Sequence, residues 1–118
     1  MAFRHLGRRV YPANTLIFEE GERGDHAYII ETGSVEIVRR TEQGARSVGV
    51  IPAGGIFGEM ALIDGAPRIA GARAIEDTVC TLVPRYVFEE KLKGTDPFVV
   101  ALLRILLANA RAATASTA

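Results

Sequence analysis

The chain of 118 residues contains little of what metal, haem or disulfide chemistry needs. It has a single cysteine, Cys80, so no disulfide can form within it, and its two histidines are 21 residues apart. Metalloenzymes on β-barrels need several His and carboxylate ligands at set spacings, and haem or iron–sulfur sensors need His or Cys ligands. No histidine stands near a candidate nucleophile. We therefore expect no enzymatic activity, no metal and no cofactor.

The chain also lacks an excess of charge and a long apolar run. Fourteen basic and fourteen acidic side chains cancel, so the chain has no general attraction for nucleic acids or anionic membranes. No run reaches the ~20 apolar residues of a membrane span, and the N-terminus has no apolar signal-peptide core. We expect a cytoplasmic protein with no membrane span and no nucleic-acid partner for this chain. Any anion that it binds must be held by local geometry.

The composition fits one folded domain over residues 1–118, because 48% of the residues are hydrophobic and 24% are charged. Residues 8–83 show short apolar runs between turn residues, which is typical of a β-sandwich or barrel. Cys80 falls in one of these runs, and we expect it to be an inert buried thiol. The expected strands are Arg8–Tyr11, Thr15–Phe18, Ala27–Glu31, Ser34–Arg40, Ser47–Ile51, Ile69–Ala74 and Val79–Val83.

After Pro84 the pattern becomes helical. Apolar residues recur at helical spacing in Arg85–Lys93, and Gly94 ends that segment. Thr95 or Asp96 can cap a second helix that runs from residue 97 to about residue 113. The sequence therefore predicts a barrel over about residues 8–84 and C-terminal helices over about residues 85–113.

The second of these helices is unusually apolar. Every residue from Phe98 to Ala108 is apolar except Arg104. A helix that lies on one domain needs only one apolar stripe, which we expect to consist of Phe98, Leu102, Ile105 and Leu106. The remaining apolar face must be covered by a ligand, by a partner helix or by both, or else by a further C-terminal domain.

The stretch from Phe57 to Ala70 carries the candidate chemistry. Residues 59–63 can form a short helix that starts at Gly58, and free N–H groups at such a start favour an anion. Arg68 follows Glu59 by nine residues, and its planar guanidinium can hold two phosphate oxygens. These residues suggest a ligand with both hydroxyls and a phosphate. They also fit a simpler interpretation, in which Glu59 serves the helix dipole and Arg68 pairs with it.

Residues 57–70, FGEMALIDGAPRIA, resemble the phosphate-binding cassette of the cyclic-nucleotide-binding domain family. This is the family of the catabolite activator protein, protein kinase A regulatory subunits and nucleotide-gated channels. Residues 24–35 resemble its glycine–aspartate turn and hairpin, and residues 50–57 resemble its lead into the cassette. The match covers roughly residues 8–113. It implies a mainly β fold, an eight-stranded jelly-roll barrel with flanking helices: a short cassette helix and two C-terminal helices.

The resemblance also implies a ligand and its contacts. It implies that Glu59 accepts a hydrogen bond from the ribose 2′-hydroxyl and that Arg68 pairs with the cyclic phosphate. In relatives the C-terminal helix closes over the base and in several it pairs subunits, which implies a homodimer through this helix. Arg104 is then a candidate for the base edge, or a cap for a neighbouring carboxylate. The backbone amides implied to complete the phosphate cradle are those of Gly58, Met60, Ala61 and Ile69.

Ile69 departs from the family pattern, which often has Ser or Thr after the cassette arginine. A hydroxyl there can bond the phosphate or the guanine amino group, and isoleucine can do neither, so we expect cAMP to be preferred over cGMP. The function implied is a cyclic-nucleotide-binding regulatory module of signal transduction. The alternative is a degenerate barrel that no longer binds nucleotide and serves protein interaction.

Overall fold

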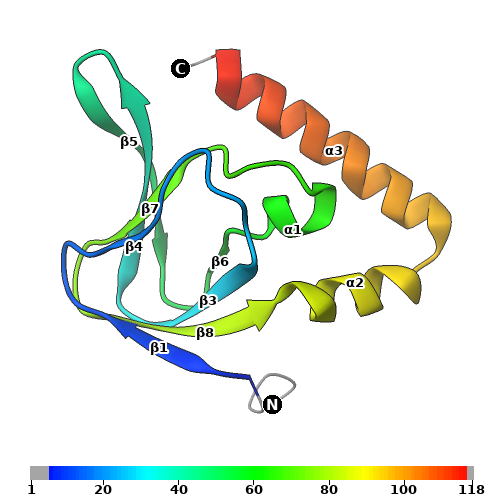
Figure 1. Ribbon diagram of the computed structural model, residues 1–118, viewed down its shortest axis with the longest axis horizontal. Helices are drawn as coiled ribbons and strands as arrows, with labels where there is room; N and C mark the ends of the chain where they lie inside the picture. The colour runs from blue at the N-terminus through cyan, green and yellow to red at the C-terminus, as the bar shows by residue number, and fades with distance from the viewer. Residues whose placement is uncertain (1–5, 117–118) are drawn as a thin grey trace.

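The computed structural model describes residues 6–116, with side chains described as far as residue 113. It contains eight strands and three helices (Figure 1). The strands are β1 (Arg8–Tyr11), β2 (Leu16–Phe18), β3 (His26–Thr32), β4 (Ser34–Thr41), β5 (Gly44–Pro52), β6 (Ile56–Phe57), β7 (Gly71–Ala74) and β8 (Thr78–Pro84). The helices are α1 (Met60–Asp64), α2 (Arg85–Lys93) and α3 (Pro97–Ser116).

The strands form two antiparallel four-stranded sheets. One has the order β1-β8-β3-β6 and the other the order β2-β7-β4-β5, so the chain alternates between the sheets for most of its length. This is the arrangement of a jelly roll, and the predicted mainly β jelly-roll fold is confirmed. The two-residue strand β6 was not predicted, because two residues are too few to show an alternating pattern.

An aromatic core fills the space between the two sheets. The rings of Tyr28 and Phe57 stack with their centroids 4.9 Å apart, and the ring of Phe18 lies 5.7 Å from that of Tyr28. Cys80 is fully buried in the same core, as expected. Its burial raises the pKa of the thiol to about 11, so the group stays protonated and unreactive near neutral pH.

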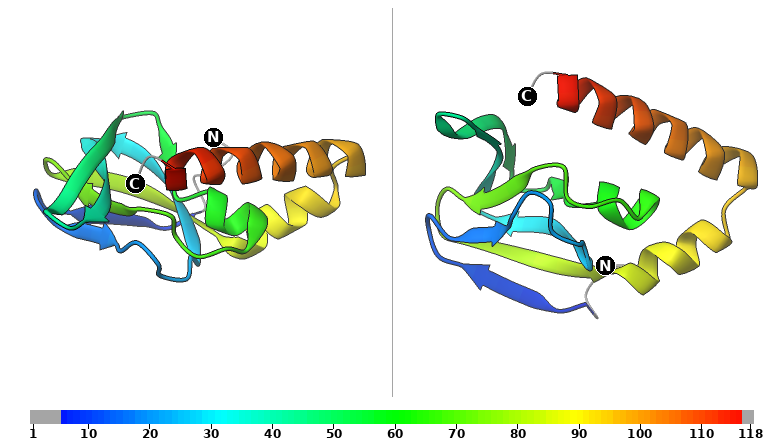
Figure 2. Two further views of the ribbon diagram at one scale, coloured as in Figure 1. Left: turned by 90° about the horizontal axis from the view of Figure 1, so that it is seen from above. Right: turned by 45° about the horizontal axis from the view of Figure 1, so that its top comes forward.

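The three helices gather at one end of the barrel. Helix α1 lies between α2 and α3, and α3 forms the outer element (Figures 1 and 2). The prediction that a stripe of α3 packs on the domain through Phe98, Leu102, Ile105 and Leu106 is wrong, because these residues are 74%, 44%, 58% and 55% exposed. The pattern could not fix which side of α3 faces inward, because almost every residue in it is apolar. The residues on the inward face are Val100, Arg104, Leu107 and Arg111.

Candidate functional site

Arg68 lies at the centre of the site, in the segment between α1 and β7. Its side chain is buried, with 6% of the residue exposed. Nη1 donates a hydrogen bond to the carbonyl oxygen of Gly58 at 2.5 Å, and Nη2 donates one to that of His26 at 2.6 Å. Cζ lies 4.0 Å from the centre of the Phe18 ring, which is cation–π distance. The guanidinium is therefore held inside the barrel on an aromatic surface.

This buried cation has no counterion in the described part of the chain. Its Nε is buried and has no hydrogen-bond partner, and none of the ion pairs involves Arg68. Burial lowers the pKa of Arg68 and outweighs the opposing effects of Tyr28 and Glu22. Burying an ion without a partner costs several kcal/mol. The site therefore favours an anion, and the simpler interpretation of an Arg68–Glu59 pair does not describe this structure.

The cassette helix α1 begins beside this guanidinium. The carbonyl of Glu59 accepts the N–H groups of Leu62 and Ile63, at 3.1 and 3.2 Å. The N–H groups of Met60 and Ala61 precede these bonds and have no partner within the helix. Gly58 adopts φ +78°, a conformation that other residues rarely adopt, which lets the chain turn into α1.

A pocket of about 220 Å³ lies between the cassette and the barrel strands. Glu59 is part of its wall, and the carboxylate makes no hydrogen bond or ion pair with the described part of the chain. Apolar side chains, among them Ile37 and Ile51, also line the pocket. The pocket therefore combines a cation, a free acceptor and an apolar surface. Six of the predicted site residues meet here: Gly58, Glu59, Met60, Ala61, Arg68 and Ile69.

Arg104 does not join this group. It lines a separate cavity of about 660 Å³ between the three helices. Arg111 lines the pocket of about 220 Å³ instead, seven residues later on the same face of α3 and roughly 10 Å further along its axis. The i to i+7 spacing of the two arginines was the signal in the sequence that could have pointed to Arg111.

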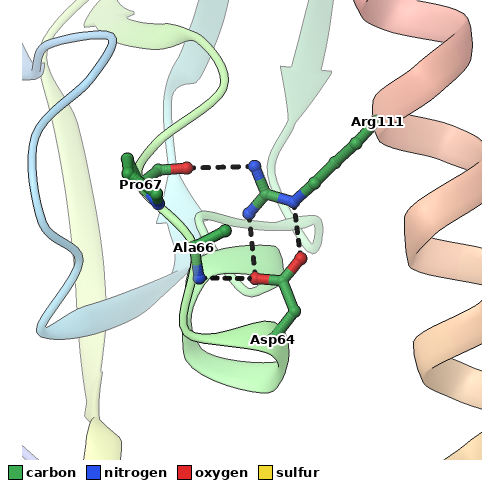
Figure 3. A network of polar contacts seen from close by, with 4 residues as sticks. All are labelled: Asp64, Ala66, Pro67 and Arg111. Atoms are coloured by element: carbon green, nitrogen blue, oxygen red, sulfur yellow. Dashed lines mark hydrogen bonds and ion pairs between the residues drawn. The ribbon is translucent and has the colours of Figure 1, made fainter.

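Arg111 joins α3 to the cassette (Figure 3). Its Nε and Nη2 donate to the two carboxylate oxygens of Asp64, at 2.5 and 3.0 Å, and Nη1 donates to the carbonyl of Pro67 at 3.0 Å. The Asp64 carboxylate also accepts the N–H of Ala66. Burial alone would raise the pKa of Asp64, but the hydrogen bonds from Arg111 and Ala66 outweigh it, and the net effect lowers that pKa.

A metal-binding cluster and a membrane-spanning helix are both absent from residues 6–116. No group of three or more His, Cys, Asp or Glu side chains in this range could hold a metal ion. Likewise, none of the described helices combines the length and the apolar character that crossing a bilayer would require.

Comparison with known proteins gives consistent matches. The family model described as cyclic nucleotide-binding domain matches residues 8–95. The cyclic AMP receptor protein of Thermus thermophilus is 37% identical over 79 residues, which cover 66% of this chain and 37% of that relative.

Two solved structures of the EAL enzyme Bd1971 are also similar. The cAMP-bound form gives a TM-score of 0.90 at 35% identity and covers 94% of this chain and 30% of that one. The cGMP-bound form gives 0.86 at 37% identity, covering 93% and 30%. The chain thus spans well under two thirds of the length of each of these relatives.

Proposed function

This chain belongs to the cyclic nucleotide-binding domain family, and from that premise we propose that Arg68 and Glu59 hold a 3′,5′-cyclic nucleotide in the pocket between cassette and barrel. The observation that carries the proposal is the buried Arg68 guanidinium without a counterion. A cyclic phosphate would supply the missing negative charge where water is largely excluded. A barrel that had lost its ligand would keep this buried charge without a counterion, which disfavours the degenerate alternative.

The other parts of the ligand match the remaining walls. The unpaired carboxylate of Glu59 would accept the ribose 2′-hydroxyl, and the N–H groups of Met60, Ala61 and their neighbours Gly58 and Ile69 would complete the phosphate cradle. The apolar wall would contact the purine base. Each of these contacts uses a group that either has no other partner in the fold or faces the pocket.

We propose that cAMP is preferred over cGMP. Ile69 lines the pocket and has no hydroxyl to offer a guanine amino group. Comparison with Bd1971 does not indicate which ligand is preferred here, since that protein is known in both a cAMP-bound and a cGMP-bound form. The proposed preference therefore rests on this one side chain.

We propose that α3 closes over the ligand and pairs with α3 of a second copy. Arg111 on its inner face forms part of the pocket wall. On the outer face Phe98, Leu102 and Ile105 recur at intervals of four and three residues, as in helix pairs, and all three are exposed. Apolar surface of this extent is uncommon on monomers.

The module is regulatory, and we propose that it has neither catalytic activity nor a cofactor of its own. Relatives such as the EAL enzyme Bd1971 show that domains of this family also occur in proteins that contain enzymes. Its independence of nucleic acid and its cytoplasmic location stay predictions.

Thermal unfolding with added nucleotide tests the proposed function. A ligand that binds only the folded state stabilises it by RT ln(1 + [L]/Kd), about 2.7 kcal/mol at one hundred times Kd. We expect cAMP, and cGMP less strongly, to raise the melting temperature by several degrees. Linear 5′-AMP, which lacks the cyclic phosphate, is the control and should have little effect. A melting temperature that neither cyclic nucleotide changes would contradict the proposal.

A further inference from the structure

Helix α3 reaches the cassette through one side chain. Among the described side chains of α3, Arg111 is the one that hydrogen-bonds outside the helix, twice to Asp64 of α1 and once to Pro67 in the segment after it. Most of the helix is otherwise exposed, whereas the Arg111 and Asp64 side chains are each only 18% exposed. A bidentate guanidinium–carboxylate pair in such a half-buried place has a defined geometry and is stronger than a pair at the surface.

The contact with Pro67 gives this ion pair a second effect. The carbonyl of Pro67 and the N–H of Arg68 belong to the same peptide group. Arg111 holds the carbonyl at 3.0 Å, and the carbonyl oxygen of Glu22 holds the N–H at 2.8 Å. Both polar atoms of the peptide that precedes Arg68 are therefore fixed, one of them by α3. The position of α3 and the backbone of the buried arginine are linked through a single guanidinium.

The contacts of Arg111 with Asp64 and Pro67, which form a clamp between α3 and the cassette, can coexist with a bound ligand. Arg111 contributes to the pocket wall, but Asp64 and Pro67, which hold it, do not line that pocket. A ligand in the pocket therefore does not compete with the two groups that anchor Arg111.

We propose that the Arg111–Asp64 clamp positions Arg68 for the ligand and couples ligand binding to the closed position of α3. The inference rests on the proposed cyclic-nucleotide binding and names a residue that makes this binding tight. Arg111 is in this sense a positioning residue, because it acts on the phosphate through the peptide of Arg68. Asp64 contributes by holding the guanidinium of Arg111 in place.

The test compares Arg111→Ala with Arg104→Ala, which removes an arginine from the same face of the same helix but outside the clamp. Calorimetry with cAMP should show roughly tenfold weaker binding for Arg111→Ala, as expected when hydrogen bonds to a charged group are lost. Arg104→Ala should bind within about twofold of the wild type. Asp64→Asn, which keeps the size of the side chain and an acceptor for Ala66, should weaken binding in the same direction by less.

Amide hydrogen exchange of α3 provides the readout of coupling. In the wild type and in Arg104→Ala, saturating cAMP should slow exchange across residues 103–113. In Arg111→Ala, saturating cAMP should leave that exchange fast although the ligand is bound. Equal affinity and equal protection of α3 in the wild type and Arg111→Ala would overturn the clamp and leave the proposed function standing. Failure of the wild type itself to bind would overturn the proposed function, so the two failures are distinguishable.

Discussion

Gly24 lies so close to Arg68 that a Cβ atom at this position would be 2.8 Å from Cζ of the guanidinium and 2.9 Å from Cβ of Ala61. The buried arginine and the start of the cassette helix therefore leave no space for a side chain at residue 24. The glycine is required here by this close approach of the cassette.

Gly24→Ala should displace the guanidinium of Arg68 and weaken cAMP binding by about tenfold, or ~1.4 kcal/mol. It should also destabilise the fold by about 1–3 kcal/mol, as overpacking does. Gly49→Ala is the matched control, because a Cβ there would meet nothing within 4 Å. Calorimetry and thermal unfolding of both variants check this. Similar affinities in the two variants would show that the space beside Arg68 does not matter.

Ile69→Thr should raise the affinity for cGMP several-fold, by ~1 kcal/mol, because the hydroxyl can bond the guanine amino group. The affinity for cAMP should change less. Ile69→Val has the same shape as the threonine variant without the hydroxyl, so it should keep the wild-type ratio of the two affinities. Competition binding measures both ratios. A wild type that already favours cGMP would refute the role given to Ile69.

Ile105→Glu should abolish self-association, because it places a charge in the middle of the exposed apolar face of α3. Val48→Glu, which places the same charge at an exposed apolar position on β5 instead of α3, should leave the oligomeric state unchanged. Sedimentation equilibrium should show a dimer for the wild type and for Val48→Glu, and a monomer for Ile105→Glu. A wild type that is monomeric at every accessible concentration would rule out the dimer.

The contribution of the Arg111–Asp64 clamp to stability should fall in acid and should not change with pH near neutrality. Because the folded state lowers the pKa of Asp64, its contribution to stability is complete above the unfolded pKa of about 3.9 and is lost as the pH falls through the lower folded value. The difference in melting temperature between the wild type and Asp64→Asn should therefore stay constant from about pH 8 to about pH 5 and narrow only in stronger acid. Narrowing that is already complete at about pH 5 would mean that another group titrates.

The fold could be predicted where local signals mark the ends of elements. The bounds of β1 and α2 agree with the sequence pattern, because Pro12 follows the last residue of β1 and Gly94 follows the last residue of α2. Strand β5 was expected over Ser47–Ile51 but extends over Gly44–Pro52, since its pairing with β4 continues to both of these ends. That residues 1–118 form a single domain stays a prediction.

The site could be predicted only as far as its members are neighbours in sequence. The cassette residues lie within one short stretch, whereas the carbonyl of His26 that holds Arg68 is 42 residues away from it. Arg111 is 47 residues from Asp64. Such contacts depend on how the sheets and α3 pack, and the apolar sequence of α3 leaves its inward face undetermined. Arg104 was named as a candidate because it stands alone in the apolar run from Phe98 to Ala108, whereas Arg111 is the residue of α3 that lines the pocket of about 220 Å³.

Calorimetric titration of cAMP into the wild type and Arg68→Ala tests the central claim most directly, with Arg68→Lys as a variant that keeps the charge and loses the planar fork. The wild type should bind one nucleotide per chain. Arg68→Ala should lose about 2–4 kcal/mol of binding free energy, because the phosphate would be buried without its partner. Arg68→Lys should fall between the two. Equal affinities for the wild type and Arg68→Ala would contradict the assignment of Arg68 as the group that holds the cyclic phosphate.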